Sequence, residues 1–275
     1  MSHITNVLGK HKLRIKKRLG QNFLQDPHAL QFIADSAGIN HQDPVLEIGA
    51  GIGNLSIYLA EKTGSFFALE KDLTLKPALS AALKSFTNTK IIFKDILKFK
   101  LPDIYSGKKL KIIGNLPYYI TTPVIINLIE QKQYINLILI TVQKEVAQRI
   151  IASPGKKDYG RLSCLLQYHT QPEILKIFPK HLFFPKPKVD SALVKLKILD
   201  SPSVKVKNEE MFFRVIQAIF SHRRKTLLNS LLTGSLQLNK DQLINILDSV
   251  NISPSIRGEK LSLSEIGKIS DKISD

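Results

Sequence analysis

The stretch Val45-Leu46-Glu47-Ile48-Gly49-Ala50-Gly51-Ile52-Gly53 decides the fold. Its first four residues form an apolar run with one acid and predict a buried strand. Alternate glycines follow at once, and residues 54–61 have the pattern of a helix. A strand, a glycine turn and a helix form a nucleotide-type site, because glycine lets the backbone approach a ligand closely. The G-x-G-x-G spacing is shorter than the dinucleotide fingerprint, so by itself it is a weak signal.

Outward from this stretch, apolar strands alternate with helices along the chain. The strands are expected at 65–70, 91–93, 110–113 and 137–142, followed by two of alternating pattern at 174–178 and 192–198. The helices are expected at 27–37, 73–83, 121–129 and 144–151. This order predicts an α/β fold with a parallel sheet and helices on both of its faces.

A shift in composition at residues 200–208 divides the chain, and beyond it only helical periodicity appears. We therefore expect a basic N-terminal arm at 1–19, an α/β domain at 20–200 and a small all-helical domain at 201–275. The helical domain is expected to bind RNA or the ribosome, for reasons given below.

The composition restricts the class of partner. Lys and Arg outnumber Asp and Glu by 40 to 23, which gives a formal net charge of +17. This excess favours a polyanion, either nucleic acid or an acidic membrane surface, and we favour nucleic acid. The single cysteine, Cys164, excludes an internal disulfide and any multi-cysteine metal site. No run resembles a signal peptide or a membrane span, so a cytoplasmic protein without membrane contact is expected.

Polar residues close successive strands of the predicted sheet. Glu70 ends one strand, Asp95 follows the next, and Asn115 ends a third. Carboxyl ends of strands line the ligand crevice of an open α/β sheet, so these side chains should converge with the glycine turn. Glu70 lies about twenty residues beyond the glycines, where an acid reaches ribose hydroxyls. A single acid on the surface often lies at a strand end by chance. Three polar residues at the ends of successive strands favour a functional site.

The segment Gly114-Asn115-Leu116-Pro117-Tyr118-Tyr119 suits a rigid loop over a cleft. Asn115 offers a carbonyl oxygen that can accept from an exocyclic amine, and Pro117 stiffens the backbone. Tyr118 supplies a flat face for stacking a base. These are the groups that methyl transfer to a base nitrogen needs. The alternative interpretation is a proline turn with a buried tyrosine.

The segment 183–191 is stiff, because prolines occupy two alternate positions. It could present Phe183 or Phe184 at a fixed place, or it could plug the core beneath a loop. We expect phosphate contacts from basic residues in three places: this segment, the N-terminal arm and a helix start of the C-terminal domain. The arm could equally be a solvated tail. The candidates for phosphate contacts are Lys16, Lys17, Arg18, Lys186, Lys188, Arg223, Arg224 and Lys225.

Taken together, the motifs resemble those of the ribosomal RNA adenine N6-methyltransferases. The resemblance runs from about residue 18 to the C-terminus. The segments 159–163, 220–231 and 257–273 resemble the housekeeping branch, which dimethylates two adjacent adenines near the 3′ end of small-subunit rRNA. The other matching segments are Gly20-Gln21-Asn22-Phe23-Leu24, Glu47-Ile48-Gly49-Ala50-Gly51, Glu70, Asp95, Asn115-Leu116-Pro117-Tyr118 and residues 183–191.

The resemblance implies a Rossmann-like class I methyltransferase sheet, S-adenosylmethionine as cofactor and no metal. The implied partner is 16S rRNA in the small ribosomal subunit or its precursor, and a monomer is the default. The implied catalytic residues are Asn115, Leu116, Pro117, Tyr118 and Phe183. The implied cofactor-binding residues are Asn22, Leu24, Gly49, Gly51, Glu70, Lys71, Asp95, Ile96 and Asn115.

By this resemblance, Glu70 takes the ribose hydroxyls and Asp95 the adenine amine of the cofactor. We hypothesise in-line displacement at the sulfonium methyl by the N6 lone pair of the target. Asn115 and the Leu116 or Pro117 carbonyl accept the amine protons, while Tyr118 and Phe183 stack the flipped adenine. No strong base is needed, because the alkylated nitrogen loses its proton readily.

Two positions depart from the family pattern, since Ala50 and Tyr119 stand where proline and asparagine are usual. Three other functions remain open. The branch that modifies a large-subunit adenine is disfavoured by Pro123 and the C-terminal segment. A nicotinamide-dependent oxidoreductase is disfavoured by the glycine spacing and the Asn-Leu-Pro-Tyr motif. A non-catalytic assembly factor would need only the basic arm and the helical domain.

Overall fold

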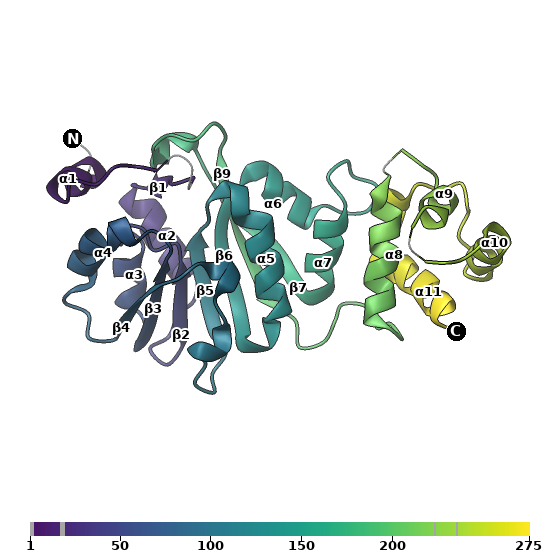
Figure 1. Cartoon of the computed structure of the whole chain (residues 1–275), viewed down its shortest axis with the longest axis horizontal. Helices are drawn as coiled ribbons and strands as arrows, with labels where there is room; N and C mark the ends of the chain where they lie inside the picture. Colours follow the sequence, from purple (N-terminus) through teal and green to yellow (C-terminus); the bar gives the residue numbers. More distant parts are fainter. Residues whose placement is uncertain (1–2, 17–19, 223, 235) are drawn as a thin grey trace. The chain divides into compact units, whose positions relative to one another are not determined.

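The computed structural model describes residues 3–16, 20–222, 224–234 and 236–275, which form two compact units. The first unit contains the described residues up to 147 together with 173–198; the second contains 148–172 and those from 199 onward. Figure 1 traces the elements of each unit. The boundary expected at residue 200 assigned 148–172 to the α/β domain. In the structure this segment joins the C-terminal helices, because α7 (Arg161–His169) packs on α8 (Glu209–Ser221).

The first unit is built on a seven-stranded sheet in the order β4-β3-β2-β5-β6-β9-β7. The strands from β4 to β6 are parallel, as the sequence predicts. β9 runs antiparallel to β6, so the sheet is mixed rather than purely parallel, a common variation in doubly wound folds. The bounds are β2 (Pro44–Ile48), β3 (Ser65–Glu70), β4 (Thr89–Phe93), β5 (Leu110–Asn115), β6 (Ile135–Gln143), β7 (Thr170–Phe178) and β9 (Ser191–Ile198).

The helices that precede α7 begin at recognisable sequence signals. α2 is capped as its sequence predicts, because the Ala29 N–H donates to Asp26 Oδ1 at 2.7 Å and proline follows the cap. The helix expected at 73–83 is divided, since a 3₁₀ turn at Leu73–Leu75 precedes α4. The bounds are α1 (His3–Lys10), α2 (Pro27–Ser36), α3 (Ser56–Ala60), α4 (Lys76–Leu83), α5 (Thr121–Glu130) and α6 (Lys144–Ile151).

Both faces of the sheet are covered, which explains why its central strands are continuous apolar runs. On one face, Val45 and Ile113 belong to a buried cluster with residues of α2, α3 and α4. Their neighbours in the strands, Leu46 and Ile112, point to the other face of the sheet and are also fully buried. The strand ends are therefore held in a rigid core, and the loops that follow them are placed reproducibly.

The basic arm contains a helix, α1, that the sequence analysis did not predict. Its Ile4 and Leu8 are buried in a cluster with Phe23 and Leu75 of the α/β unit. A spacing of four residues places both on one face of the helix. The arm is thus packed against the unit rather than being only a charged tail.

The second unit is helical and has its own core. Besides α7 and α8 it contains α9 (Leu227–Leu232), α10 (Lys240–Ser249) and α11 (Leu263–Ser274). One buried cluster joins these helices and includes Cys164, a free thiol, as expected. None of the helices formed by the described residues has the length and apolar character that a bilayer crossing requires. Across the same residues, no group of His, Cys, Asp or Glu is arranged to hold a metal ion.

Candidate active site

A cavity of about 800 Å³, including its open mouth, lies where β2, β3 and β5 end and the segment after β4 begins. Carboxyl ends of parallel strands meet at one edge of a sheet, which brings together residues that are far apart in the sequence. Gln21 and Tyr119 also line this cavity; neither was among the predicted site residues, although both lie in segments expected near the site. The predicted residues that line it are Asn22, Gly49, Gly51, Glu70, Lys71, Asp95, Ile96, Asn115, Leu116, Pro117 and Tyr118.

Two predicted residues, Leu24 and Phe183, do not line this cavity. They pair with each other where β1 (Phe23–Leu24) runs antiparallel to β8 (Phe183–Phe184). Their exposed fractions are 3% and 2%, and both belong to the main core cluster. Phe183 thus occupies the position of the hydrophobic plug that the sequence analysis left open, not that of a stacking platform at the cavity.

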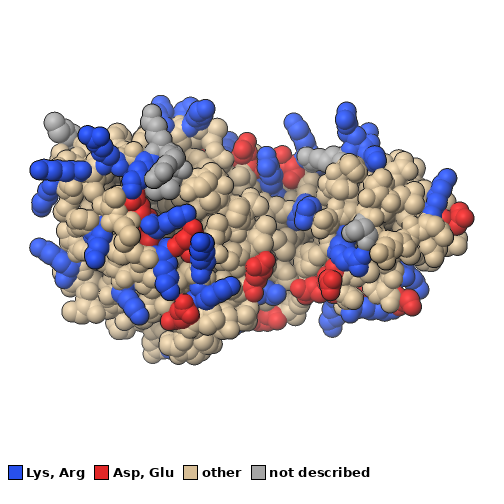
Figure 2. All heavy atoms as spheres, in the orientation of Figure 1, with Lys and Arg blue, Asp and Glu red and all other residues tan. Residues whose placement is uncertain are grey.

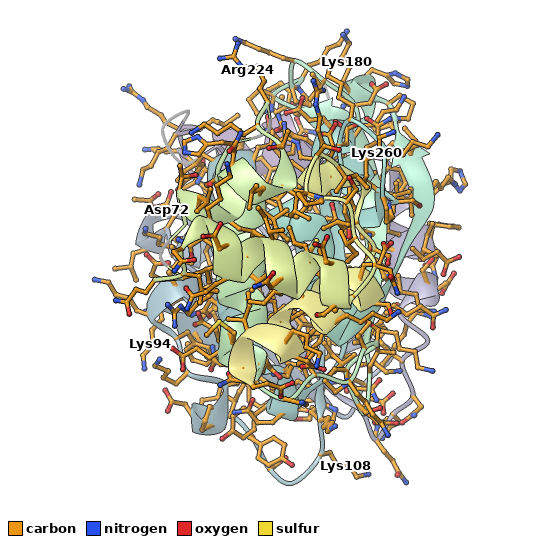
Figure 3. All side chains as sticks on the ribbon, turned by 90° about the vertical axis from the view of Figure 1, so that its right-hand side faces the viewer. Asp72, Lys94, Lys108, Lys180, Arg224 and Lys260 are labelled. Carbon is orange, nitrogen blue, oxygen red and sulfur yellow. The ribbon has the colours of Figure 1, made fainter. Side chains whose placement is uncertain are left out.

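The predicted phosphate-binding residues lie in several places. Lys186 and Lys188 are exposed on the loop after β8, and Arg224 and Lys225 are exposed in the helical unit, where Arg224 extends away from the ribbon (Figure 3). Lys16 is instead paired with Asp72. Figure 2 shows Lys and Arg side chains across the visible face of the α/β unit, with a few acids among them. The remaining candidates, Lys17, Arg18 and Arg223, lie outside the described residues.

The glycine turn forms the wall of the cavity after β2. Gly49 and Gly51 have φ values of +73° and +60°, which favour glycine over any residue with a side chain. A Cβ on Gly51 would also lie 2.9 Å from the ring of Phe23. The Gly49 N–H donates to the Leu69 carbonyl at 2.8 Å, which joins this turn to the end of β3. The absence of side chains here leaves backbone exposed to a ligand.

Glu70 is held by three backbone donors at the end of β3. The N–H groups of Gly51, Lys71 and Asp72 donate to its carboxylate oxygens at 2.7–2.8 Å. Burial raises the pKa of Glu70, and these three bonds oppose that change. A carboxylate has about four acceptor positions, so Glu70 retains capacity for a hydroxyl of a bound ligand.

Asp95 follows β4 and faces Lys71, whose Nζ lies 2.7 Å from Asp95 Oδ2. Its other oxygen accepts from the Leu97 N–H at 3.1 Å and caps a short 3₁₀ turn. Burial alone would raise the pKa of Asp95, but the bonds from Lys71 and Leu97 lower it overall. Asp95 is therefore an ionised acceptor at the edge of the cavity.

The amide of Asn115 has a defined orientation at the end of β5. Its Nδ2 donates to the Asn22 carbonyl at 2.7 Å, across 93 residues of sequence. Because a primary amide has one donor end and one acceptor end, this bond directs Oδ1 away from the Asn22 carbonyl. Asn115 lines the cavity, and none of the described residues donates a hydrogen bond to its Oδ1, so this end of the amide can receive an amine.

The two carbonyls after Asn115 differ in their partners. The Pro117 carbonyl already accepts from the Ile120 N–H at 3.1 Å and from Thr121 Oγ1 at 3.2 Å. Both of its lone pairs are thus engaged, which leaves the Leu116 carbonyl as the better second acceptor. The hydroxyl of Tyr118 is bonded to Ser191 Oγ at 2.7 Å, which sets the position of its ring. Burial raises the pKa of Tyr118, so its hydroxyl stays protonated.

Glu47 lies one layer deeper, inside β2, and is 2% exposed. Ser56 Oγ donates to it, yet burial raises the pKa of Glu47 to about 8. The nearby charge of Glu70 acts in the same direction. Glu47 is therefore a neutral acid beneath the glycine turn at moderate pH, and not a further negative charge.

This arrangement fits a nucleoside-bearing cofactor. Two acidic acceptors lie beyond neighbouring strands, at Glu70 and Asp95, where hydroxyls and an exocyclic amine can be bound. The glycine turn exposes backbone between them, and Asn115 adds an acceptor for a second amine.

Comparisons with known proteins agree with the geometry. Residues 12–267 match the family model described as ribosomal RNA adenine dimethylase. The chain is 42% identical over 271 residues to ribosomal RNA small subunit methyltransferase A of Alkaliphilus oremlandii, covering 97% of this chain and 94% of the relative. It is 43% identical over 278 residues to the protein of the same name from Streptococcus pneumoniae, with the same coverage of both chains.

Solved structures share the fold. A dimethyladenosine transferase from Plasmodium falciparum has a TM-score of 0.75 at 24% identity, covering 90% of this chain and 95% of that chain. The 23S rRNA methyltransferase ErmE has a TM-score of 0.71 at 23% identity, covering 92% and 100%. These likenesses show a Rossmann-like α/β fold, and the match to the family model over most of the sequence shows that the chain belongs to the ribosomal RNA adenine dimethylase family.

Proposed function

We propose that this chain transfers methyl groups from S-adenosylmethionine to N6 of two adjacent adenines near the 3′ end of 16S rRNA. The substrate is the small ribosomal subunit or its precursor in the cytoplasm, and the enzyme acts as a monomer. One observation carries the proposal: the Asn22 carbonyl holds the donor end of the Asn115 amide and so directs its acceptor end away from that carbonyl, in a residue that lines the same cavity as Glu70 and Asp95.

The cofactor residues have distinct tasks. Glu70 accepts from the ribose hydroxyls, because its carboxylate is already oriented by three backbone donors. Asp95 accepts from the adenine amine, which then shares this carboxylate with Lys71. Bound in the cavity, S-adenosylmethionine supplies an electrophilic methyl group on its sulfonium.

The target amine is held by two acceptors of this chain. Asn115 Oδ1 and the Leu116 carbonyl each accept a hydrogen bond from one N6–H of the target, which draws the lone pair out of conjugation with the ring and directs it across the cavity. The departing proton passes to solvent. Most of the rate enhancement then comes from positioning and local electrostatics, which do not require a strong base.

The base must leave its stack to reach these acceptors. Tyr118 supplies the stacking face, since its ring is fixed by the bond to Ser191. The exposed Lys186, Lys188, Arg224 and Lys225 contact phosphates of the rRNA.

The experiment is methyl incorporation from labelled S-adenosylmethionine into small subunits that lack the modification, followed by nuclease mapping. Dimethyladenosine at two adjacent adenines near the 3′ end of 16S rRNA is expected. Large subunits serve as the control substrate, and labelling of a 23S rRNA adenine instead would place the enzyme in the other branch of the family. The protein could instead bind the subunits without incorporating methyl groups and show no cofactor binding by calorimetry. That result would support an assembly factor and overturn the proposal.

A further inference from the structure

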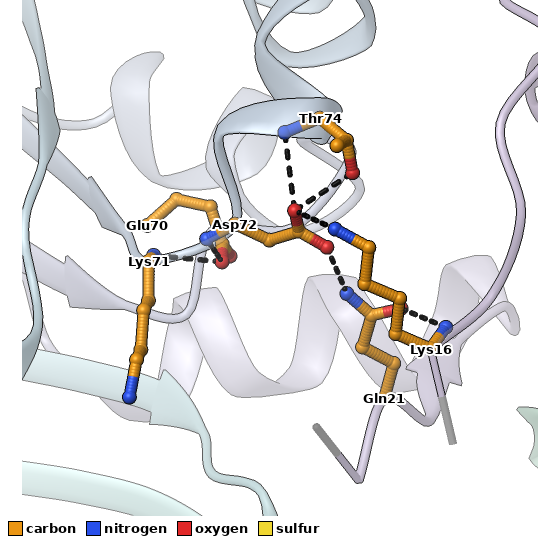
Figure 4. A network of polar contacts seen from close by, with 6 residues as sticks. All are labelled: Lys16, Gln21, Glu70, Lys71, Asp72 and Thr74. Atoms are coloured by element: carbon orange, nitrogen blue, oxygen red, sulfur yellow. Dashed lines mark hydrogen bonds and ion pairs between the residues drawn. The ribbon is translucent and has the colours of Figure 1, made fainter. Parts of the chain in front are cut away.

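A buried carboxylate outside the predicted site connects the N-terminal arm to the cavity. Asp72 is 5% exposed and lies two residues beyond Glu70. Its Oδ1 accepts from Lys16 Nζ at 2.6 Å, and its Oδ2 accepts from Gln21 Nε2 at 2.9 Å (Figure 4). The backbone N–H and hydroxyl of Thr74 also donate to Oδ1, at 3.1 and 2.7 Å. Both oxygens are thus engaged by residues from two parts of the chain.

The contacts of Asp72 with Gln21 and with Glu70 both lead to the candidate active site. Gln21 lines the cavity, and its Oε1 accepts from the Lys16 N–H at 2.8 Å, so the two residues are also bonded to each other. Asn22, the next residue, provides the carbonyl that holds the Asn115 amide. On the other side, the backbone N–H of Asp72 donates to Glu70 at 2.7 Å. Asp72 therefore lies between the cofactor acid and the amine acceptor.

We propose that Asp72 is a positioning residue, which fastens the Gln21–Asn22 segment to the end of β3 so that the Asn22 carbonyl holds Asn115 in its productive orientation. The inference rests on the proposed function for its catalytic consequence, but the fastening itself belongs to the free protein. Apolar packing of Ile4 and Leu8 holds the arm at its far end, whereas Asp72 holds the end beside the cavity.

The burial of Asp72 makes this contact more than a surface ion pair. The side chain of Asp72 is 3% exposed and that of Lys16 is 30% exposed. Removal of a buried partner leaves the other groups without their acceptor, which costs more than the loss of an exposed pair. Without Asp72, the Lys16 ammonium and the Gln21 amide both lose a partner, and the segment that carries the Asn22 carbonyl is released.

The test compares Asp72→Ala, Asp72→Asn and Lys16→Met with a matched control. Lys62 is also 30% exposed and forms an ion pair at 2.8 Å with Asp35, whose side chain is 55% exposed; Lys62 does not line the cavity, so Lys62→Met removes a matched lysine from an exposed pair elsewhere. The first readout is hydrogen exchange of the backbone amides of residues 20–23 in the free protein. We expect faster exchange in the Asp72 variants and in Lys16→Met, and no change in Lys62→Met.

The second readout is single-turnover methylation of small subunits. We expect Asp72→Ala to lower the transfer rate about tenfold, equivalent to about 1.4 kcal/mol, with little change in KM for the subunits. Asp72→Asn should recover part of this loss, because it retains an oxygen for Lys16 and Thr74. If Asp72→Ala does not fold, Lys16→Met decides the matter, since it leaves Asp72 and its Thr74 bonds in place.

Two outcomes would overturn the inference. One is wild-type exchange at residues 20–23 in folded Asp72→Asn and Lys16→Met. The other is a loss of rate in the Asp72 variants that only matches a loss of folded protein, which would make the role merely structural. An inactive wild-type enzyme would instead refute the proposed function, while the exchange measurement would still report on the fastening.

Discussion

Replacing Asn115 with aspartate tests the orientation of the amide with almost no change in shape. In the wild-type protein, Asn115 Nδ2 donates to the Asn22 carbonyl at 2.7 Å. In Asn115→Asp an ionised carboxylate oxygen would face that carbonyl, and two acceptors at this distance repel each other. Loss of one partner of a partly buried hydrogen bond costs about 1–3 kcal/mol. If the whole cost falls on the transition state, the rate of transfer drops by a factor of about 5 to 150.

Acidification should partly reverse this effect in Asn115→Asp. A protonated carboxyl has one O–H donor and one acceptor oxygen, so it can reproduce both functions of the amide. The assay is single-turnover methylation of small subunits from pH 5 to 8, with Asn115→Ala as the control that cannot recover. The relative rate of Asn115→Asp should rise as the pH falls, whereas that of Asn115→Ala should stay low. Transfer by Asn115→Ala at the wild-type rate would refute the mechanism outright.

Three further substitutions test other parts of the site. Glu47→Gln removes an acid whose pKa in the folded protein is raised from 4.5 to about 8. As the pH rises across that window, the free energy of unfolding of the wild type should fall by up to about 1.4 kcal/mol per pH unit, because the unfolded state releases its proton first. Urea unfolding should therefore show the variant to be more stable than the wild type at pH 8 but not at pH 4, and parallel profiles would contradict this. Gly51→Ala places a Cβ 2.9 Å from Phe23 at a backbone φ of +60°. The thermal midpoint of unfolding should therefore fall by the equivalent of about 1–2 kcal/mol, and calorimetry should show weaker cofactor binding. An unchanged midpoint would exclude this strain. Tyr118→Ala should weaken rRNA binding by about 1–3 kcal/mol through lost stacking. Tyr118→Phe keeps the stacking face but loses the bond to Ser191 that positions it, so its loss should be smaller; equal losses in the two variants would assign the whole effect to the hydroxyl.

Much of the fold was predictable, because periodic burial leaves a clear signal in the sequence. β2 and β6 are buried on both faces and are therefore apolar runs. Glu70 and Asn115 are the last residues of β3 and β5, and Asp95 lies two residues after β4, so the strand pattern also placed these polar residues. The helix α1 was missed for the opposite reason. Its segment is only eight residues long, and the helix is stabilised by tertiary burial of Ile4 rather than by any strong local signal.

The exact role of each aromatic was not predictable from the motifs. Tyr118 and Phe183 both follow the pattern of residues that could stack a base, but the structure places only Tyr118 at the cavity. Phe183 pairs with Leu24 across β1 and β8, and this contact joins segments more than 150 residues apart. Pattern along the chain cannot distinguish a ring that faces a ligand from one that fills the core beneath it.

The chemistry depends on a feature that no local motif contains. Asn115 can hold an amine only if its acceptor end faces the cavity, and the orientation comes from a carbonyl 93 residues away. A backbone carbonyl has no residue type, so any residue at position 22 could in principle provide it. What the sequence must supply instead is the means to keep that backbone in place, and the bonds from Gln21 and Lys16 to Asp72 do so. The Asn115 amide and this distant carboxylate should therefore be tested together: if both act on one orientation, the rate losses of Asn115→Asp and Asp72→Ala should be less than additive in the double variant.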